Sequence, residues 1–193
     1  MSKAIIISIR PEYVCKILNG GKTIEIRKTM PKCELPCKVY IYCTKGKKLY
    51  KCVSNFDEDL LNGKVVAEFT LNKVDTLERD LNDWLPKNRY DVSNELLKDI
   101  NLNQNELWNY GQGKTLYAWH IDDLKIYDKP KELSEFSHFI PNNKCPTKQC
   151  GTNCEDCPNY DEEHETCLAL YYAHRAIKRP PQSYCYVEEL EDE

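Results

Sequence analysis

Four polar residues that could do chemistry together lie close in sequence near the start of the chain. The segment reads Gly20-Gly21-Lys22-Thr23-Ile24-Glu25-Ile26-Arg27, which has the form G-x-K-x-x-E-x-R. In a strand, side chains alternate between two faces, so Thr23, Glu25 and Arg27 would share one polar outward face. A lysine beside a carboxylate in a cleft can bind phosphate or activate an acyl group. The alternative is a surface Glu25–Arg27 pair contributing well under about 1 kcal/mol, with Lys22 solvated.

A second candidate site lies late in the chain, where five of the eleven cysteines cluster. They are Cys145, Cys150, Cys154, Cys157 and Cys167, and Cys154 and Cys157 form a C-x-x-C pair. Structural zinc takes four thiolate or imidazole ligands, and a C-x-x-C turn supplies two of them. We favour Cys145, Cys154, Cys157 and Cys167, but Cys150 could replace Cys145 and His164 could replace Cys167. A polar segment needs a crosslink to hold its shape, which favours zinc over free thiols or an iron–sulfur cluster.

Length and composition limit the class of protein. A chain of 193 residues can bury the core of one domain. No apolar run approaches the roughly 20 residues that span a bilayer, and the apolar run near Met1 is too short for a secretory signal. We therefore expect a soluble, cytoplasmic protein without a membrane partner. The net charge of -4 argues against coating nucleic acid by bulk electrostatics, so any such contact must be focused.

The remaining six cysteines are expected to be reduced, because cytosolic thiols rarely form disulfides. They are Cys15, Cys33, Cys37, Cys43, Cys52 and Cys185, and they lie in or beside apolar segments where cysteine behaves as a small hydrophobe. Cys33 and Cys37 could instead supply a second metal pair. The four histidines form no catalytic constellation, and we expect His120 to be structural.

The elements that position these residues follow from hydrophobic patterning. A buried strand over 4–9 precedes a helix over roughly 11–19, which Asn19-Gly20-Gly21 ends. Further strands are predicted over 23–28, 38–44, 65–77, 115–127 and 183–190, with an exposed loop over 45–63. Residues 78–110 form a helical insertion in which Ser93 could cap a helix, and residues 138–178 form the cysteine-rich insertion. The order predicts one α+β domain over 1–193, built on a small mixed or antiparallel β-barrel with a helix near its mouth.

The glycine-to-arginine segment, at a helix end running into a strand, resembles the signature of the ASCH family within the PUA-like superfold. The opening strand followed by Pro11-Glu12-Tyr13-Val14 and the segment Tyr117-Ala118-Trp119-His120-Ile121 resemble ASCH domains as well. The resemblance covers roughly residues 3–127 and the final strand. Residues 179–190 are similar to the tail of small ASCH proteins carried by phages and mobile elements of low-GC Gram-positive bacteria.

The resemblance implies a cleft for RNA or a modified nucleotide between the barrel mouth and the first helix. The residues expected to contact phosphate or base are Arg10, Lys22, Glu25, Arg27 and Lys28. Tyr117, Trp119, Tyr184 and Tyr186 are either core residues or platforms on which a base stacks.

Whether the protein is a binder or an enzyme stays open, because PUA-like folds include both. One ASCH branch, the acetylcytidine amidohydrolases, uses the motif lysine, a threonine three residues later and a glutamate from the helical insertion. Here that threonine position holds Glu25, and Thr23 lies beside it. The catalytic candidates are therefore Lys22, Glu25 and Thr23, for an amidohydrolase or a ribonuclease. A third hypothesis is a phage effector that binds a host protein through its zinc insertion and acidic tail.

Overall fold

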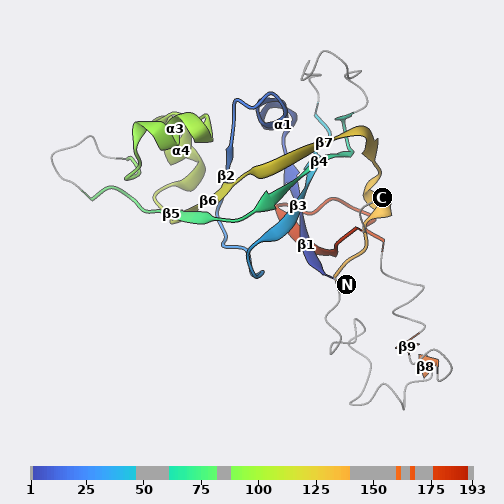
Figure 1. Ribbon diagram of the computed structural model, residues 1–193. Coiled ribbons are helices and arrows are strands. Elements are labelled where there is room, and N and C mark those ends of the chain that lie inside the picture. Colours follow the sequence, from blue (N-terminus) through green and yellow to red (C-terminus); the bar gives the residue numbers. More distant parts are fainter. Residues whose placement is uncertain are drawn as a thin grey trace.

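The structure is a computed structural model that describes residues 2–46, 61–81, 88–139, 160–161, 166–167 and 176–190. Its largest unit is a five-stranded sheet in the order β10-β1-β3-β4-β7 (Figure 1). The strands are β1 (Lys3–Ile9), β3 (Cys37–Cys43), β4 (Val65–Leu71), β7 (Asp122–Lys131) and β10 (Tyr184–Glu188). β1 and β3 are parallel, and the other neighbours are antiparallel. The mixed sheet expected from the sequence is confirmed.

A second sheet has three strands in the order β2-β6-β5. These are β2 (Ile24–Arg27), β6 (Leu116–His120) and β5 (Val74–Leu77), all antiparallel to their neighbours. A two-stranded pair, β8 (Tyr160–Asp161) and β9 (Thr166–Cys167), is separate from both sheets. Four short helical elements complete the described fold: α1 (Pro11–Leu18), α3 (Asn94–Ile100), α4 (Gln104–Gly111) and the 3-10 turn η1 (Leu133–Glu135).

Two nearly continuous segments pass from one sheet to the other. β4 leads into β5 across two residues, and β6 leads into β7 across Ile121 alone. The single strand predicted over 115–127 is therefore two strands with a break at Ile121, and Asp123, the second residue of β7, adopts a φ of 49°. In the described residues the strand pairings do not close into a ring, because β2 pairs with β6 and has no ladder to β1 or β10. The expected closed barrel is thus not found, whereas the α+β class is confirmed.

Alternation along the central strands buries both faces of the large sheet. In β1, Ile5, Ile7 and Ile9 pack with α1 on one face. Ala4 and Ile6 pack on the other face, with residues that include Phe136 and Ile177. Burial on both faces explains why β1 is a continuous apolar run rather than an alternating one.

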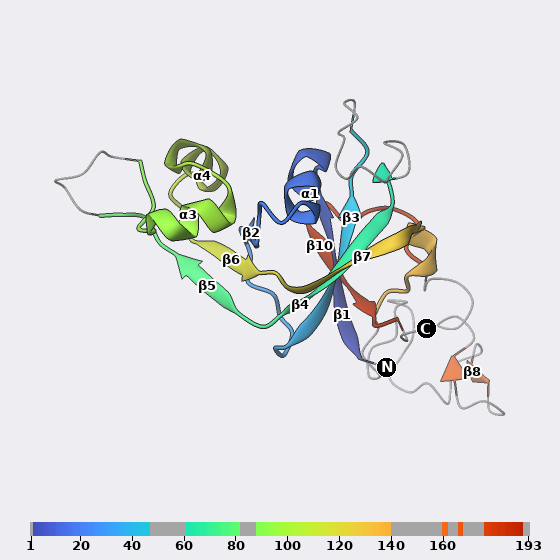
Figure 2. The ribbon, with the colours of Figure 1, turned by 45° about the horizontal axis from the view of Figure 1, so that its top comes forward.

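Helices α3 and α4 pack on the smaller sheet. In Figures 1 and 2, α3 and α4 lie beside β2, β5 and β6, away from the central strands. Their core includes Ile100 and Leu107 from the helices and Ile24 and Ile26 from β2. Ser93 caps α3 as expected, because its hydroxyl accepts a hydrogen bond from Leu96 N at 3.1 Å. The division into one domain with insertions at 78–110 and 138–178 stays a prediction.

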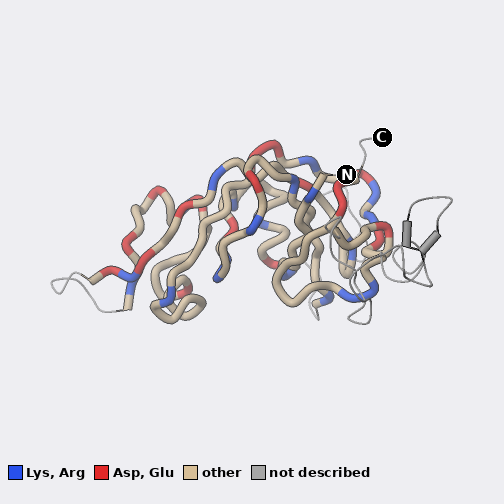
Figure 3. Tube along the Cα trace, turned by 90° about the horizontal axis from the view of Figure 1, so that it is seen from below, with Lys and Arg blue, Asp and Glu red and all other residues tan. Residues whose placement is uncertain are grey.

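No helix within the described ranges is long and apolar enough to cross a membrane. Figure 3 shows basic and acidic residues interspersed along the described trace. Together with the net charge of -4, this agrees with the expectation that any contact with a polyanion is focused.

Candidate ligand-binding cleft

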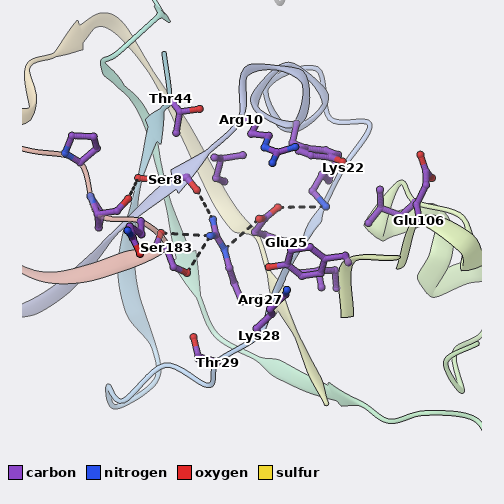
Figure 4. A pocket seen from close by; sticks show the side chains of 18 residues that line it. Ser8, Arg10, Lys22, Glu25, Arg27, Lys28, Thr29, Thr44, Glu106 and Ser183 are labelled. Atoms are coloured by element: carbon purple, nitrogen blue, oxygen red, sulfur yellow. Dashed lines mark hydrogen bonds and ion pairs between the residues drawn. The ribbon is translucent and has the colours of Figure 1, made fainter. Parts of the chain in front are cut away.

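A cleft of about 770 Å³ opens between the edge of β2 and the end of β1. α1 contributes Tyr13 to its lining, α4 contributes Glu106 and Tyr110, and residues 180–183 complete the wall before β10. The cleft thus lies where the two sheets fail to close on each other. Figure 4 shows Lys22, Glu25 and Arg27 side by side in this cleft.

β2 determines which side chains face the cleft. It pairs with β6 so that Glu25 is opposite Trp119 and Arg27 is opposite Tyr117. Ile24 and Ile26 pack in the core shared with α3 and α4, although Ile26 also borders the cleft. The predicted alternation is confirmed, but its polar face does not point outward to solvent: Glu25 is 8% exposed and Arg27 is 6% exposed.

Lys22 is buried at the base of the cleft. The turn after α1 places it there: Gly20 has a φ of +72°, and the Lys22 amide donates to Lys16 O at 3.0 Å. Its ammonium donates to Ile100 O at the end of α3 at 2.8 Å and lies 3.5 Å from Glu25 Oε2. Lys22 is only 2% exposed, so the alternative of a solvated Lys22 is wrong. The cause is tertiary packing of the helical insertion against the turn.

Arg27 spans the gap between the two sheets. Its Nη2 donates to Ser8 O of β1 at 2.9 Å, and its Nη1 lies 3.5 Å from both Ser183 O and Ser183 Oγ. Its Nε is 3.3 Å from Glu25 Oε1. Because protein groups contact all three guanidinium nitrogens, Arg27 stabilises the open side of the fold in the absence of a strand ladder.

Glu25 is the common partner of both cations at the cleft floor. One carboxylate oxygen faces Arg27 and the other faces Lys22 (Figure 4). We call these three residues the floor triad. Burial lowers the pKa of Lys22 from its usual 10.5, and the opposing effect of Glu25 does not cancel this. The alternative of a weak surface pair is therefore wrong for these residues.

Two further cations lie at the rim. Arg10 and Lys28 line the cleft and are exposed, unlike the floor triad. Lys28 Nζ lies 4.8 Å from the centre of the Tyr110 ring, within the range of a cation–π contact. The structure therefore brings together all five residues predicted to bind nucleic acid, but divides them into a buried set and an exposed set.

Two tyrosines line the cleft that were not predicted from the sequence to do so. Tyr13 from α1 and Tyr110 from α4 both line the cleft, and Tyr110 is 38% exposed. Burial raises the pKa of each phenol, so both stay protonated at neutral pH. Tyr13 lies in the first helix, which was expected beside the cleft, so its position could have indicated a role in the lining. Tyr110 could be placed there only from the tertiary fold.

The aromatic residues singled out from the sequence lie elsewhere. Trp119 is fully buried, and its ring packs 5.4 Å from that of Tyr184. Tyr184 donates to Met30 O, and Tyr186 accepts from Lys32 N. Tyr117 packs against the main core. None of the four lines the cleft, so the core interpretation holds for them.

Candidate nucleophiles are less favourably placed than the acid–base groups. Thr23 is exposed and does not line the cleft, so the structure does not bring it to Lys22 and Glu25. Ser8 and Ser183 do line the cleft. The Ser8 hydroxyl donates to Pro181 O at 2.6 Å, and the Ser183 hydroxyl contacts Arg27. Glu106, in the helical insertion, lines the cleft but accepts a hydrogen bond from Asn103 N in a capping box.

The proposed zinc ligands cannot be placed. The side chains of Cys145, Cys150, Cys154, Cys157 and Cys167 lie outside the described part of the structure. Within the described residues, no group of three or more His, Cys, Asp or Glu side chains could hold a metal ion.

Cys15 is disulfide-bonded, so the expectation that it is a reduced thiol is wrong.

His120 takes part in a small polar cluster on the smaller sheet. Its Nε2 lies 2.7 Å from Asp75 Oδ2, and Lys73 donates to the same oxygen at 2.9 Å. Partial burial would raise the pKa of Asp75, but hydrogen bonds from Lys73 and His120 outweigh it and leave that pKa lowered. None of these residues lines the cleft, which agrees with a structural role for His120.

Comparison with solved structures identifies the class of fold. The chain is similar to a serine-to-alanine variant of the ASCH protein of Zymomonas mobilis, with a TM-score of 0.50 and 16% identity over 96% of this chain and 89% of that one. The fold is therefore that of an ASCH domain, as the sequence predicted. Another structure from Zymomonas mobilis, titled ASCH, gives a TM-score of 0.46 and 18% identity over 67% of this chain and 73% of that one. No family model and no curated protein matches the chain.

Proposed function

We propose that the cleft binds a nucleotide or a short single-stranded RNA, with the base inside and the phosphate at the rim. The observation that carries this proposal is the division of charges described above. A buried carboxylate, held between two buried cations, faces a cavity of about 770 Å³ whose exposed edge carries Arg10 and Lys28. A site of this size suits one base with its sugar rather than a duplex.

The floor triad suits recognition of a base edge. Each Glu25 oxygen has capacity to accept a further hydrogen bond, because a carboxylate offers about four lone-pair sites. An exocyclic amino group or ring N–H of a base is a matching donor, as glutamate can accept from the amino group of cytosine. Lys22 and Arg27 each pair with one Glu25 oxygen and so orient the carboxylate, and in this proposal they act mainly through Glu25 and not through phosphate.

The rim suits phosphate. Arg10 and Lys28 are exposed and line the cleft, so their charges are available to an incoming anion. Tyr110 is half exposed and lies against Lys28, which offers a face on which a base could stack. The low count of rim cations fits a focused contact and agrees with the net charge of -4.

The test is a titration of the purified protein with fluorescein-labelled RNA oligomers, mononucleotides and N4-acetylated cytidine. We expect saturable binding that the double variant Arg10→Ala/Lys28→Ala weakens. Lys125→Ala is the matched control, because Lys125 is 64% exposed on β7 and does not line the cleft. Equal binding by the double variant and the control would contradict the proposal. Capture of a protein partner with no nucleic acid, together with no binding in the titration, would favour the effector hypothesis.

One observation favours a second candidate, an enzyme that acts on nucleosides or RNA. The lowered pKa of Lys22 increases the fraction of neutral amine at a given pH, and a neutral amine can act as a general base. Incubation with acetylated cytidine and RNA, followed by chromatography of products, tests this candidate. Glu25→Gln should then reduce turnover by about a hundredfold or more, whereas a pure binder forms no product at all.

We also propose, from the sequence, that the cysteine-rich insertion holds one structural zinc ion through four of its five cysteines. Elemental analysis of protein purified without added metal should give about one zinc per chain. Absence of both zinc and iron from such a preparation would contradict this proposal without affecting the cleft.

A further inference from the structure

Two thiols outside the cleft lie in direct contact. Cys33 Sγ and Cys37 Sγ are 2.9 Å apart, and both are free cysteines. They lie in the segment that joins β2 to β3, and Cys37 is the first residue of β3. A disulfide bond would bring the two sulfur atoms to about 2.05 Å, so a movement of less than about 1 Å would close it.

Local contacts hold this segment in place. The Lys32 amide donates to the Tyr186 hydroxyl at 2.6 Å, and Lys32 O accepts from Lys3 Nζ at 2.5 Å. Tyr184 fixes the same segment by donating to Met30 O at 3.2 Å. The segment is thus tied to β1 and β10 directly before Cys33, which restrains the backbone on that side of the pair.

The two sulfurs differ in access. Cys37 is 7% exposed, whereas Cys33 is only half-buried. Burial raises the pKa of Cys37 well above its usual range, and contact with Cys33 adds to the effect. Cys37 therefore keeps its proton in the resting state, and Cys33 is the sulfur that a solvent-borne reactant meets first.

A metal site is the competing role for the pair. Two thiolates do not complete the four ligands of a structural zinc ion. Within the described residues, no third His, Cys, Asp or Glu joins them in a group able to hold a metal. The geometry instead suits a reaction that needs two sulfurs only.

We propose that Cys33 and Cys37 form a reversible dithiol/disulfide couple that exchanges with low-molecular-weight disulfides. Cys33 loses its proton to solvent and attacks one sulfur of the small disulfide, forming a mixed disulfide and releasing one thiolate, which takes up a proton. Cys37 then loses its proton to solvent and attacks the Cys33 sulfur, forming the Cys33–Cys37 bond and expelling the second thiolate, which takes up a proton. The pair is oxidised by two electrons, and the small disulfide is reduced to two thiols.

The chain offers a direct assay for this reaction. Trypsin cleaves after Lys32 and Lys38 and so releases the peptide 33–38, whose only cysteines are the proposed pair. The full-length protein is equilibrated in buffers of oxidised and reduced glutathione, quenched in acid, unfolded, alkylated and digested. In oxidising buffer we expect this peptide to have lost two hydrogens and to carry no alkyl group. In reducing buffer we expect it to carry two alkyl groups, one on each cysteine.

Cys185 is the internal control, because it is a free, half-buried cysteine on β10 and is the only cysteine in the peptide 179–193. We expect it to stay alkylated under the conditions that oxidise the pair. Equal glutathione attachment at Cys185 and Cys33 would mean general thiol reactivity and would overturn the proposal. Full alkylation of the 33–38 peptide in oxidising buffer would overturn it too.

Two variants separate the roles of the sulfurs. Cys37→Ser should trap Cys33 as a stable mixed disulfide with glutathione, because the second step is lost. In Cys33→Ser, Cys37 should take up no glutathione, because it is buried. After quenching and unfolding it should therefore carry the alkyl group. If Cys37→Ser fails to fold, the wild-type peptide and Cys33→Ser still decide the question. A stable mixed disulfide on wild-type Cys33 would show that Cys37 does not resolve it, which contradicts the proposal.

Discussion

The floor and the rim of the cleft contain the same kinds of charged residue and are expected to serve different purposes. At the floor, Lys22, Glu25 and Arg27 are each less than 10% exposed, and they pair with one another and with backbone carbonyls, although the buried Arg27 Nε makes an ion pair with Glu25 and no hydrogen bond. At the rim, Arg10 and Lys28 are exposed to solvent. A charge that is already paired contributes to the shape of the site, whereas an exposed charge is available to a ligand. The G-x-K-x-x-E-x-R pattern therefore does not by itself identify the residues that contact phosphate.

The largest expected effect concerns the floor. Glu25→Ala leaves Lys22 and Arg27 as buried cations without their shared anion, and we expect a loss of about 3–5 kcal/mol in the free energy of unfolding. Chemical denaturation measures it. Glu34→Ala is the control, because Glu34 is exposed between β2 and β3, and its effect should stay within about 0.5 kcal/mol. Equal stability of the two variants would mean that the floor triad is not a structural unit.

A smaller effect, on binding rather than stability, is expected at Tyr110. If a base stacks on this ring, Tyr110→Ala should weaken RNA binding by about 1–3 kcal/mol. Tyr110→Phe keeps the ring and removes the hydroxyl, so it should bind almost as the wild type does. Fluorescence titration with one oligomer compares the three proteins. A similar loss in both variants would assign the contact to the hydroxyl and not to stacking.

The rim cations should have a still smaller effect, visible in the salt dependence. Each phosphate contact to single-stranded nucleic acid contributes a slope of about -0.7 to a plot of log affinity against log salt. With two rim cations we expect a slope of about -1.4, reduced by about 0.7 in Arg10→Ala or Lys28→Ala. Both variants should keep wild-type stability, since the two side chains are exposed. An unchanged slope in both variants would mean that neither Arg10 nor Lys28 contacts phosphate.

The sequence predicted the local features of this site better than its environment. Alternation in β2 correctly predicted that Ile24 and Ile26 pack in the apolar core with the helices while Glu25 and Arg27 do not, because side-chain direction is a local property of a strand. Burial is not local: Lys22 is covered through Ile100, which is 78 residues away in sequence, and Arg27 contacts Ser183, 156 residues away. Patterning offered no means to foresee those contacts, and so the polar face was assigned to solvent.

The same limit applies to the fold. The ASCH fold, the first helix and the central strands followed from the motif and from hydrophobic patterning. The open side of the sheet arrangement did not, because it depends on whether β2 reaches β1 or β10. The bend at Ile121 and Asp123 directs β6 and β7 into different sheets, and the side chain of Arg27 spans the remaining gap. Polar alternation over 115–127 gave no sign of that bend.

The smallest expected effect is on the pH dependence of stability, and it tests whether Lys22 belongs to the floor. Its folded-state pKa is lowered by burial from the usual 10.5, so between that lowered value and 10.5 the unfolded chain binds more protons than the folded one. Stability from this group therefore rises with pH through that window, is complete above 10.5, and is lost as pH falls through the folded-state value. Lys22→Met removes the titrating group while keeping an apolar chain of similar length. We expect the unfolding free energy of the wild type, minus that of Lys22→Met, to increase as pH rises toward 10.5. Groups that titrate there and lie far from Lys22 cancel in the difference. Lys125→Met, at an exposed position, should show no such trend. A difference that decreases with rising pH would mean that attraction to Glu25 outweighs burial, and the floor would then hold a charged lysine whose role is electrostatic rather than basic.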